Sequence, residues 1–396
     1  MRDDTNNEVV ILASSRTPMG GFQGVLHDAP CTQLGATAIQ GVLEQAPVAV
    51  ETIGEVIMGC VLPAGLGQAP ARQAALGANL PKSIGCTTIN KMCGSGMKAA
   101  MLAFDSILAG SNNVVVAGGM ESMSNAPYLS AKARSGLRIG HSVLLDHMFI
   151  DGLEDAYDKG RLMGTFAEDC AHRYNLSREV QDNFAIESLT RAKRAIVDGS
   201  FDSEIKKVEV KTRKTHHSIE QDEQPLNASL EKIPYLKPAF KKDGTVTAAN
   251  SSSISDGAAA LIIARRSIAE QNGINPKARI IGHTTYAHDP EWFTTAPISA
   301  IRSLMSKIGW TNSDVDLFEI NEAFAVVTLA AMAELDLPHD KVNVHGGACA
   351  LGHPIGASGA RIIVTLLNAL EKYDLKRGIA ALCIGGGEAT AVAIER

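Results

Sequence analysis

Two cysteines stand in similar surroundings near opposite ends of the sequence. Cys93 is followed by glycines at 94 and 96, Cys383 is followed by glycines at 385–387, and His353 lies between the two cysteines. A cysteine thiol has an ordinary pKa of about 8.5, so a nearby imidazole can convert it to the reactive thiolate near neutral pH. The pattern therefore indicates acyl transfer, with one cysteine as the nucleophile and the other as a base.

Cys93 lies where a strand pattern has ended and a helix pattern is about to begin, in the run NKMCGSG from Asn90. Backbone N–H groups at the start of a helix favour negative charge and would stabilise a thiolate. The flanking glycines also leave room for a bulky thioester. On this spacing alone, a small buried cysteine of the core is an equally good interpretation.

His353 lies in the loop GHPIGASG at residues 352–359. Because Pro354 disfavours helical geometry in the residue before it, the imidazole should project from a loop. A buried structural histidine is the alternative interpretation. Among the eleven histidines, this one alone stands in a glycine-flanked loop held by a proline, and this favours a functional role.

Cys383 ends an apolar run at 380–384 that has the pattern of a strand. The three glycines that follow carry N–H groups free of side-chain bulk, and such an array can hold a developing oxyanion. A dinucleotide-binding loop is the alternative, but the pattern G-x-G-x-x-G is absent, and neither a helix nor a ribose-binding acid follows. Gly385 is therefore expected to belong to an oxyanion site.

Asn321 and Glu322 follow the apolar run 317–320, which also has a strand pattern. An amide at the end of a strand can orient a water molecule without changing the charge, which helps where an enolate forms beside a thiolate. Glu322 is open to two interpretations, as a general base or as an ion-paired structural acid.

Short apolar runs that alternate with helix-like stretches would position these residues. The runs at 9–13, 55–58, 114–117 and 261–264 have the length of strands, so the pattern predicts strands joined by crossover helices. Apolar residues occur on every face of the helix predicted at 97–109. Such a helix should be buried all round.

An internal repeat supports the same arrangement. In the first copy, Gly-Ser-Gly at 94–96 opens a helix, and the strand 114–117 runs into Gly118 and Gly119. In the second copy, Ala-Ser-Gly at 357–359 opens a helix, and the strand 379–384 runs into the three glycines. The repeat predicts two duplicated halves that face one another across a cleft.

The segment from about 123 to 250 differs from both copies. It contains a charged helix pattern at 177–198 and the mixed tract KKVEVKTRKTHH from Lys206. Long insertions in α/β enzymes usually cover or line the active site, so an inserted domain is expected here, with a solvated decoration as the alternative. The chain then returns through small residues at 248–255 to a strand at 258–264.

Charge and cysteine usage limit the partners and the compartment. The formal net charge is −6 with no sustained basic block, which argues against nucleic acid and against a polybasic membrane anchor. The seven cysteines form no Cys-x-x-Cys pair and no zinc-like spacing, so we expect a reducing compartment and no metal. The start MRDDTNNE resembles no secretory or transit signal, and no apolar run reaches the roughly 18 residues of a membrane span. A cytoplasmic protein acting on small molecules is expected.

Taken together, these motifs resemble the thiolase family, in particular its members that act on acetyl-CoA and acetoacetyl-CoA. The likeness covers nearly the whole chain, and a set of this size in this order is highly specific. The motifs are RTP at Arg16, LPAGLGQAPARQAAL from Leu62, NKMCGSGMKAA from Asn90, VVVAGGMESMSNAPY from Val114, DGLEDAY from Asp151, GTVTAANSSSISDGAAAL from Gly244, NEAFA from Asn321, GGACALGHPIGASGAR from Gly346 and LCIGGG from Leu382.

The resemblance implies a role for each catalytic candidate. Cys93 would be acylated, His353 would activate it, and Cys383 would exchange the α-proton of a second acetyl-CoA. One oxyanion hole would consist of His353 with a water held by Asn321, and the other of the backbone N–H groups of Cys93 and Gly385.

The resemblance also implies a fold, a domain plan and an assembly. The fold would be α/β, a five-layered α-β-α-β-α core of two βαβαβαββ halves with an inserted loop domain. We expect an N-terminal half at residues 1–122 plus 253–276, a loop domain at 123–252 for coenzyme A binding and oligomerisation, and a C-terminal half at 277–396. Family members form dimers or tetramers, and a homotetramer is expected.

Coenzyme A would enter as part of the substrate and not as a cofactor, and no cofactor is expected. Ser252 matches the family serine that contacts the pantetheine amide. Leu162 stands where many members have histidine, and Phe293 stands where the bacterial biosynthetic pattern has methionine, whereas the mitochondrial type has an aromatic residue there. The stretch 220–227 has no clear match to the family arginine that contacts adenine. The other residues that match the pantetheine tunnel are Ala248, Met163, Phe240, Ala323 and Phe324.

The implied reaction is a two-step condensation of two acetyl-CoA molecules to acetoacetyl-CoA and free coenzyme A, reversible through the same groups. A thiolase for longer 3-ketoacyl chains is an alternative within enzymes. A silent acyl-CoA-binding scaffold on the same fold is an alternative outside them. The presence of Cys93, Asn321, His353 and Cys383 together argues against the scaffold.

Overall fold

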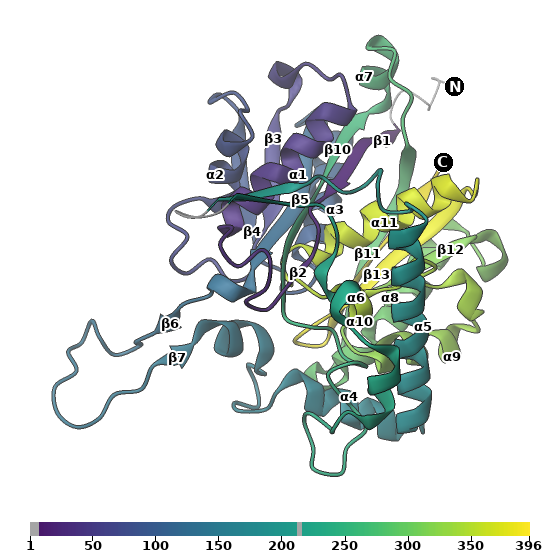
Figure 1. The fold of residues 1–396 in the computed structure, drawn as a ribbon. Helices are drawn as coiled ribbons and strands as arrows, with labels where there is room; N and C mark the ends of the chain where they lie inside the picture. Colours follow the sequence, from purple (N-terminus) through teal and green to yellow (C-terminus); the bar gives the residue numbers. More distant parts are fainter. Residues whose placement is uncertain (1–7, 212–215) are drawn as a thin grey trace.

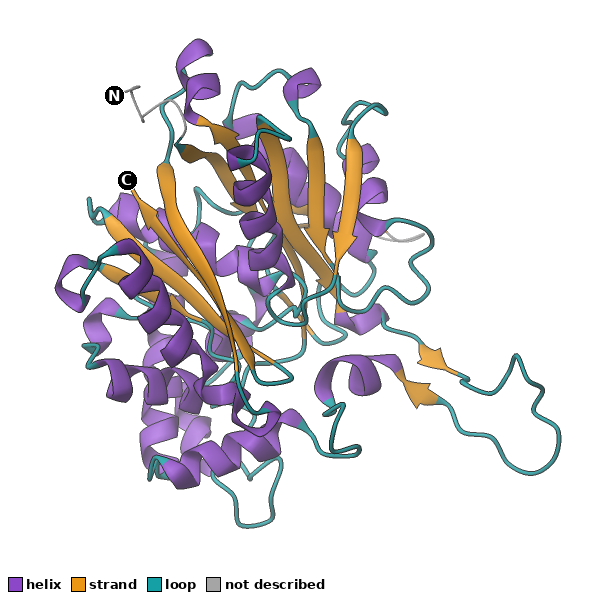
Figure 2. Ribbon diagram, turned by 180° about the vertical axis from the view of Figure 1, so that it is seen from behind, coloured by secondary structure: helices purple, strands orange, loops and turns teal. Residues whose placement is uncertain are grey.

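The computed structural model describes residues 8–211 and 216–396, and its framework is a ten-stranded sheet in two halves. The strand order is β12-β13-β14-β11-β1-β10-β5-β3-β4, with β2 (Gly20–Gly21) beside β10. The halves meet where β1 pairs with β11 through Val10 with Arg279 and Ile11 with Ala278. Figure 2 shows the two groups of strands as separate fans with helices between and outside them.

Each half repeats the same strand plan of parallel neighbours followed by an antiparallel return. The first half contains β1 (Val9–Arg16), β3 (Glu55–Gly59), β4 (Gly85–Ile89), β5 (Val114–Ser122) and β10 (Ser255–Arg265). The second half contains β11 (Ala278–Ala287), β12 (Leu317–Ile320), β13 (Arg377–Ile384) and β14 (Glu388–Glu395). The duplicated halves expected from the sequence are therefore present.

Helices complete five layers. The first outer layer contains α1 (Cys31–Gln45) and α2 (Pro70–Gly77), the middle layer contains α3 (Ser95–Leu108) and α11 (Ser358–Lys372), and the second outer layer contains α8 (Ala296–Ile308) and α9 (Ala325–Leu335). The apolar core divides in the same way, with one large cluster on the outer face of each half-sheet and one around the two middle helices. This arrangement confirms the predicted α-β-α-β-α fold class.

Two sequence-based details were wrong. The helix predicted at 97–109 to be buried all round is α3, and its last turn exposes about half of Leu108. The strand predicted to end at Ala117 continues through Gly118 and Gly119 to Ser122. A Cβ on Gly118 would lie 2.1 Å from the carbonyl oxygen of Ala259 on β10, so this glycine serves a close approach of strands and not a turn.

Between the end of β5 at Ser122 and the start of β10 at Ser255 lies the segment expected to be an insertion, called the inserted segment below. Its elements are β6 (Tyr128–Leu129), β7 (Leu145–Asp146), α4 (Met163–Arg173), α5 (Arg178–Val197), β8 (Val208–Lys211), β9 (His216–Ile219) and α6 (Glu223–Asn227). A long arm at β6 and β7 projects from the body of the molecule (Figure 1). In contrast, α4 and α5 pack on α9 of the second half.

The helix predicted at 177–198 is α5, which the hydroxyl of Ser177 caps by accepting a hydrogen bond from the backbone N–H of Val180. Part of the mixed tract from Lys206 forms the hairpin of β8 and β9, and its residues 212–215 lie outside the described residues. Within the described part of the chain, no helix combines the length and the apolar character needed to cross a bilayer.

Candidate active site

Cys93 lies in a tight turn between β4 and α3. The preceding residue, Met92, has a φ of 48°, in the left-handed region that side chains other than glycine rarely adopt. The hydroxyl of Ser95 holds this turn, because it accepts a hydrogen bond from the backbone of Lys91 and donates one to the carbonyl of Met92. The sequence therefore places Cys93 at the N-terminal end of the middle-layer helix, as predicted.

The fold brings Cys93, Cys383 and Gly385 together. The backbone N–H groups of Gly385 and of Cys93 itself hydrogen-bond the thiol of Cys93, and the two thiols lie close enough for their charges to interact. A Cβ on Gly94 would lie 2.4 Å from the side chain of Ile384, so the nucleophile turn is pressed against the end of β13. An ion pair of Lys91 with Glu388 joins the same two segments.

These surroundings keep both thiols and the imidazole neutral. Residue Cys93 retains some solvent exposure, but desolvation of its sulfur raises the pKa to about 11, against the opposing effect of the two N–H bonds. Burial also raises the pKa of Cys383 and lowers that of His353 to about 3. A neutral imidazole and a neutral thiol suit general-base catalysis, in which the proton moves as the thiol attacks.

His353 is held from two sides, by its own loop and by the stretch that precedes β10. Its backbone N–H donates to the carbonyl of Ser253, and its ring Nδ1 lies 2.5 Å from the hydroxyl of Ser358. Within the described chain, the other ring nitrogen, Nε2, is buried and has no hydrogen-bond partner. A buried polar atom without a protein partner is unusual in a native structure, and a catalytic role is one explanation for it.

Asn321 presents a second buried atom of this kind. Its Oδ1 accepts a hydrogen bond from Arg361, whose guanidinium also pairs with Glu319 at 2.9 Å. Its Nδ2 is buried and has no hydrogen-bond partner among residues 8–211 and 216–396. Because Arg361 occupies the acceptor side of the amide, the free side is the donor that could hold a water or an oxyanion.

Glu322, which the sequence left open as a general base, has its carboxylate occupied by hydrogen bonds to structural groups. Its carboxylate accepts hydrogen bonds from Asn343, from Ser188 of α5 and from the backbone of Cys349, and burial raises its pKa. These contacts tie the inserted segment to the second half of the fold. They support the structural interpretation of this residue.

Most of the expected tunnel residues belong to the same apolar cluster as Cys383 or pack against it. Phe293, Ala323 and Phe324 belong to one buried cluster with Cys383, and Met163 and Phe240 pack against that cluster. The rings of Phe240 and Phe324 meet edge to face with centroids 6.0 Å apart.

The remaining tunnel candidates lie at the edges of this group. Ser252 donates hydrogen bonds from its backbone and its hydroxyl to the carbonyl of Ala323, at 2.9 and 3.0 Å. Leu162 immediately precedes α4 and is partly buried, whereas Ala248 is exposed. Apolar side chains with a serine beside them have the chemistry that a pantetheine arm needs.

Sequence reasoning did not single out Ser358, Arg361 or Glu121. Arg361 and Glu121 had a visible signal, because each is the one charged residue in a run of apolar and small residues, at 360–370 and at 114–123. Ser358 has a short, common side chain among small residues, and only its hydrogen bonds reveal it.

Two family models together match almost the whole chain. "Thiolase, N-terminal domain" matches residues 9–267, and "Thiolase, C-terminal domain" matches residues 274–396. The acetyl-CoA acetyltransferase of Schizosaccharomyces pombe is 47% identical over 393 residues, which cover 99% of each chain. Acetyl-CoA acetyltransferase 2 of Arabidopsis thaliana is 50% identical over 392 residues, which cover 98% of this chain and 97% of the relative.

Solved structures show the same similarity. The acetyl-CoA acetyltransferase of Bacillus anthracis superimposes with a TM-score of 0.96 at 40% identity, covering 99% of this chain and 100% of that one. A thiolase from Ascaris suum in complex with coenzyme A superimposes with a TM-score of 0.92 at 41% identity, covering 98% of this chain and 100% of that one.

Proposed function

Because the chain belongs to the thiolase family, we propose that it is an acetyl-CoA C-acetyltransferase, which condenses two acetyl-CoA molecules and also runs the reverse thiolysis. The observation that carries the proposal is the meeting of Cys93, Cys383 and the N–H group of Gly385 in one site. A nucleophile, a second thiol and an oxyanion donor are the groups that a two-step Claisen condensation needs.

In the first step, Nε2 of His353 takes the proton of Cys93 as the sulfur attacks the thioester carbonyl of acetyl-CoA. The N–H groups of Cys93 and Gly385 stabilise the oxyanion that forms. The carbon–sulfur bond to coenzyme A then breaks, and the imidazolium returns its proton to the departing thiolate. An acetyl group remains on Cys93, and free coenzyme A leaves.

In the second step, His353 takes the proton of Cys383, and the resulting thiolate removes the α-proton of a second acetyl-CoA. The protonated Nε2 of His353 and a water held by Nδ2 of Asn321 stabilise the enolate oxygen. The enolate carbon attacks the acetyl group and expels the sulfur of Cys93, which takes the proton from His353. Every group thus returns to its starting state.

The test is to trap the acetylated enzyme. Incubation with radiolabelled acetyl-CoA, rapid acid quench and peptide mapping should place one labelled acetyl group on Cys93, and a second acetyl-CoA should convert the label to acetoacetyl-CoA. Absence of the label from Cys93 would contradict the proposal and would favour the silent acyl-CoA-binding scaffold.

A second candidate is a thiolase for longer 3-ketoacyl chains. The aromatic rings of Phe240, Phe293 and Phe324 around Cys383 favour a short acyl group, because each ring fills space that a longer chain would need. Rates on acetoacetyl-CoA and 3-ketooctanoyl-CoA separate the two candidates. A clear preference for the longer substrate would overturn the assignment of an acetyl-specific enzyme.

The proposal extends to substrate binding. Ser252 with Leu162, Met163, Phe240, Ala248, Phe293, Ala323 and Phe324 would line the path of the pantetheine arm toward Cys93. The division into halves at 1–122 plus 253–276 and 277–396, with a loop domain at 123–252, is part of the same proposal. Packing of α4 and α5 on α9 supports a role for the inserted segment in this path.

Assembly and location complete the proposal. The arm between β6 and β7 exposes Leu137, Val143, Leu144 and Ile139, the last with 98% of its surface accessible, and four exposed apolar side chains on a projecting arm support contact with another copy. We assign a homotetramer built as a dimer of dimers. The seven cysteines are free of disulfides, which supports a reducing, cytoplasmic location. Cell fractionation tests the location.

A further inference from the structure

Glu121, near the end of β5, is a fully buried carboxylate bonded to two separate loops. Its oxygens accept hydrogen bonds from the backbone N–H groups of Val61 at 2.9 Å, Leu62 at 3.1 Å and Gly356 at 2.9 Å. Val61 and Leu62 follow β3, whereas Gly356 lies three residues after His353. The carboxylate therefore fastens the histidine loop to a loop of the other half of the fold.

The first of these loops forms part of the wall around Cys93. Val61 and Leu62 belong to one apolar cluster with Ile355, and Cys93 packs against that cluster. Glu121 is thus bonded both to a loop that packs near the proposed nucleophile Cys93 and to the loop that carries the proposed base His353. Its charge is also one of the influences that raise the pKa of Cys93.

The loop that carries His353 packs closely against β5 and against the residue that follows β3. The loop backbone therefore has little room to move. A Cβ on Gly356 would lie 2.6 Å from Oε2 of Glu121 and 3.0 Å from the Cα of Cys60. A Cβ on Gly119 would lie 2.0 Å from the carbonyl oxygen of Gly356. Backbone therefore touches backbone at this point, and Glu121 supplies the polar bonds that hold the contact.

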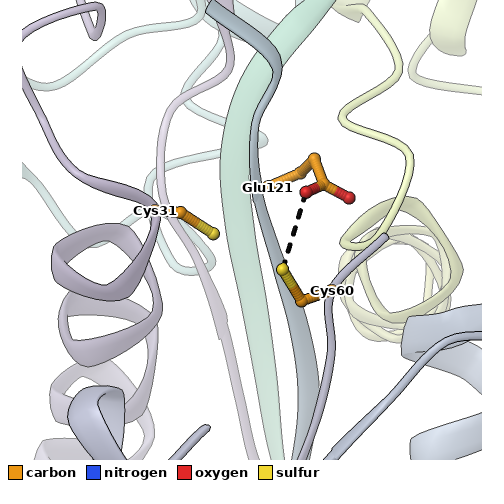
Figure 3. A group of neighbouring side chains, drawn as sticks. All are labelled: Cys31, Cys60 and Glu121. Atoms are coloured by element: carbon orange, nitrogen blue, oxygen red, sulfur yellow. Dashed lines mark hydrogen bonds between the residues drawn. The ribbon is translucent and has the colours of Figure 1, made fainter. Parts of the chain in front are cut away.

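Within the described chain, Glu121 accepts hydrogen bonds from backbone N–H groups and one thiol, and from no lysine or arginine. Burial raises its pKa to about 7, whereas the three N–H bonds and the Cys60 thiol favour the ionised form. The titratable groups that face it are the thiol of Cys60, whose sulfur lies 3.7 Å from Oε1, and Cys31 beside that thiol (Figure 3).

These three side chains are also the one group of possible metal ligands in the described part of the chain, with ligand atoms within 4.8 Å of one another. Each carboxylate oxygen is already engaged, however. Oε1 bonds Leu62 and Cys60, and Oε2 bonds Val61 and Gly356. Four donors on two oxygens account for the burial of this carboxylate without an ion.

We infer that Glu121 is a positioning residue that fixes the His353 loop against the wall of the Cys93 site, so that Nε2 meets the thiol in the reactive geometry. The inference rests on the proposed acetyl transfer. Glutamine, although the same size, cannot replace it, because its NH2 group would face N–H donors on one side. Displacement of a catalytic group by about 1 Å can cost up to about a hundredfold in rate.

The experiment compares three variants with the wild type. Glu121→Gln should lower kcat and the rate of Cys93 acetylation by about tenfold to a hundredfold and leave KM for acetyl-CoA within about twofold. It should also shift the pH titration of Cys93 alkylation by iodoacetamide to lower pH, because a negative charge has been removed. Gly356→Ala should lower kcat in the same way but leave that titration in place, since it moves the loop and keeps the charge.

Glu168→Gln is the matched control. Glu168 is another buried carboxylate that accepts backbone N–H bonds, from Thr245 and Val246, but it joins α4 to a later stretch of the inserted segment and does not hold the histidine loop. It should lower the midpoint of urea unfolding and leave both kcat and the Cys93 titration unchanged.

Several outcomes would overturn the inference. One is wild-type kcat in Glu121→Gln. Another is wild-type kcat in Gly356→Ala, which decides the matter if the glutamine variant does not fold. A third is one equivalent of Cd²⁺ bound by the wild type and lost in Cys60→Ser, because the donors would then be metal ligands. Failure of the wild type to acetylate Cys93 would instead contradict the proposed function. The failure of the positioning role and the failure of the proposed function are therefore distinguishable.

Discussion

The hydroxyl of Ser358 lies 2.5 Å from Nδ1 of His353 and donates its own proton to the carbonyl of Pro354, 3.0 Å away. A serine hydroxyl has a single proton, so when Ser358 donates to Pro354 it accepts from the N–H at Nδ1 of His353. In this arrangement Nδ1 carries the ring proton, and Nε2 keeps the free electron pair. This is the tautomer in which His353 can act as a base.

Replacement of Ser358 by alanine should remove the hydrogen bond that favours this tautomer. We expect Ser358→Ala to lower the rate of Cys93 acetylation by about tenfold to a hundredfold, because the wrong tautomer and other ring orientations become populated. Quenched-flow measurement of the labelled acetyl group gives the rate. Ser106→Ala is the control, since Ser106 donates only within α3 to Ala103. An unchanged rate in Ser358→Ala would show that another group orients the ring.

The two cysteines should divide the reaction between them. Cys93→Ala should abolish the labelled acetyl-enzyme, whereas Cys383→Ala should still be acetylated on Cys93 but lose condensation by about a hundredfold to ten-thousandfold, the usual contribution of a general base. The two half-reactions are measured separately, with Cys86→Ala on β4 as the control. Equal loss of both half-reactions in Cys383→Ala would contradict this division of labour.

The reactivity of Cys93 should depend on pH in an unusual range. Its pKa is raised to about 11, so the fraction of thiolate in the free enzyme should continue to rise with pH beyond the ordinary thiol value of about 8.5. Iodoacetamide alkylation of Cys93, followed by mass spectrometry, measures this. A plateau near neutral pH would instead indicate a preformed thiolate and imidazolium pair.

The arm should hold the assembly together. The double variant Ile139→Asp with Leu144→Asp places two charges on the exposed tip between β6 and β7 and should convert tetramers to dimers at micromolar concentration. Light scattering coupled to size exclusion reads the mass against 41.8 kDa per chain. Val197→Asp, at an exposed apolar position outside the arm, should leave the mass unchanged. A tetramer that survives both charges would place the contact elsewhere.

His345 should make the fold sensitive to acid. The ring is buried between Phe201 and Tyr373, and neither nitrogen has a hydrogen-bond partner in the part of the chain that the structure describes. Burial lowers its pKa from 6.5 to about 4. Between these values the unfolded chain binds a proton that the folded protein does not, so stability is complete above pH 6.5 and falls toward pH 4.

His345→Phe should remove this dependence. The loss of stability on acidification, at most about 3 kcal/mol for this group, should shrink in the variant, because phenylalanine fills the site without titrating. Urea unfolding at about pH 8 and about pH 5 measures it, with the exposed His27→Gln as the control. An equal loss in wild type and His345→Phe would assign the acid sensitivity to other groups.

The sequence by itself determined the fold class and supplied the candidates for the reactive groups. Strand-length apolar runs, the repeated glycine-flanked helix starts and the motifs around Cys93, His353 and Cys383 are local patterns, and local patterns report the element in which a residue lies. These local patterns gave the wrong strand length where a residue distant in the sequence packs against the strand. Gly118 looks like a strand end, yet it stays inside β5 because the backbone of Ala259 approaches it.

Only the tertiary structure decided how the reactive groups are held. Three contacts show this: Gly385 with the Cys93 thiol, Arg361 with Asn321, and Glu121 with two loops. Each joins parts of the chain that are far apart in the sequence. Some also depend on which atom of a side chain makes the hydrogen bond. Such contacts are set by strand order and by close approach of the two halves. Hydrogen-bond direction between residues far apart leaves no periodic trace in the sequence, and so it could not be predicted from it.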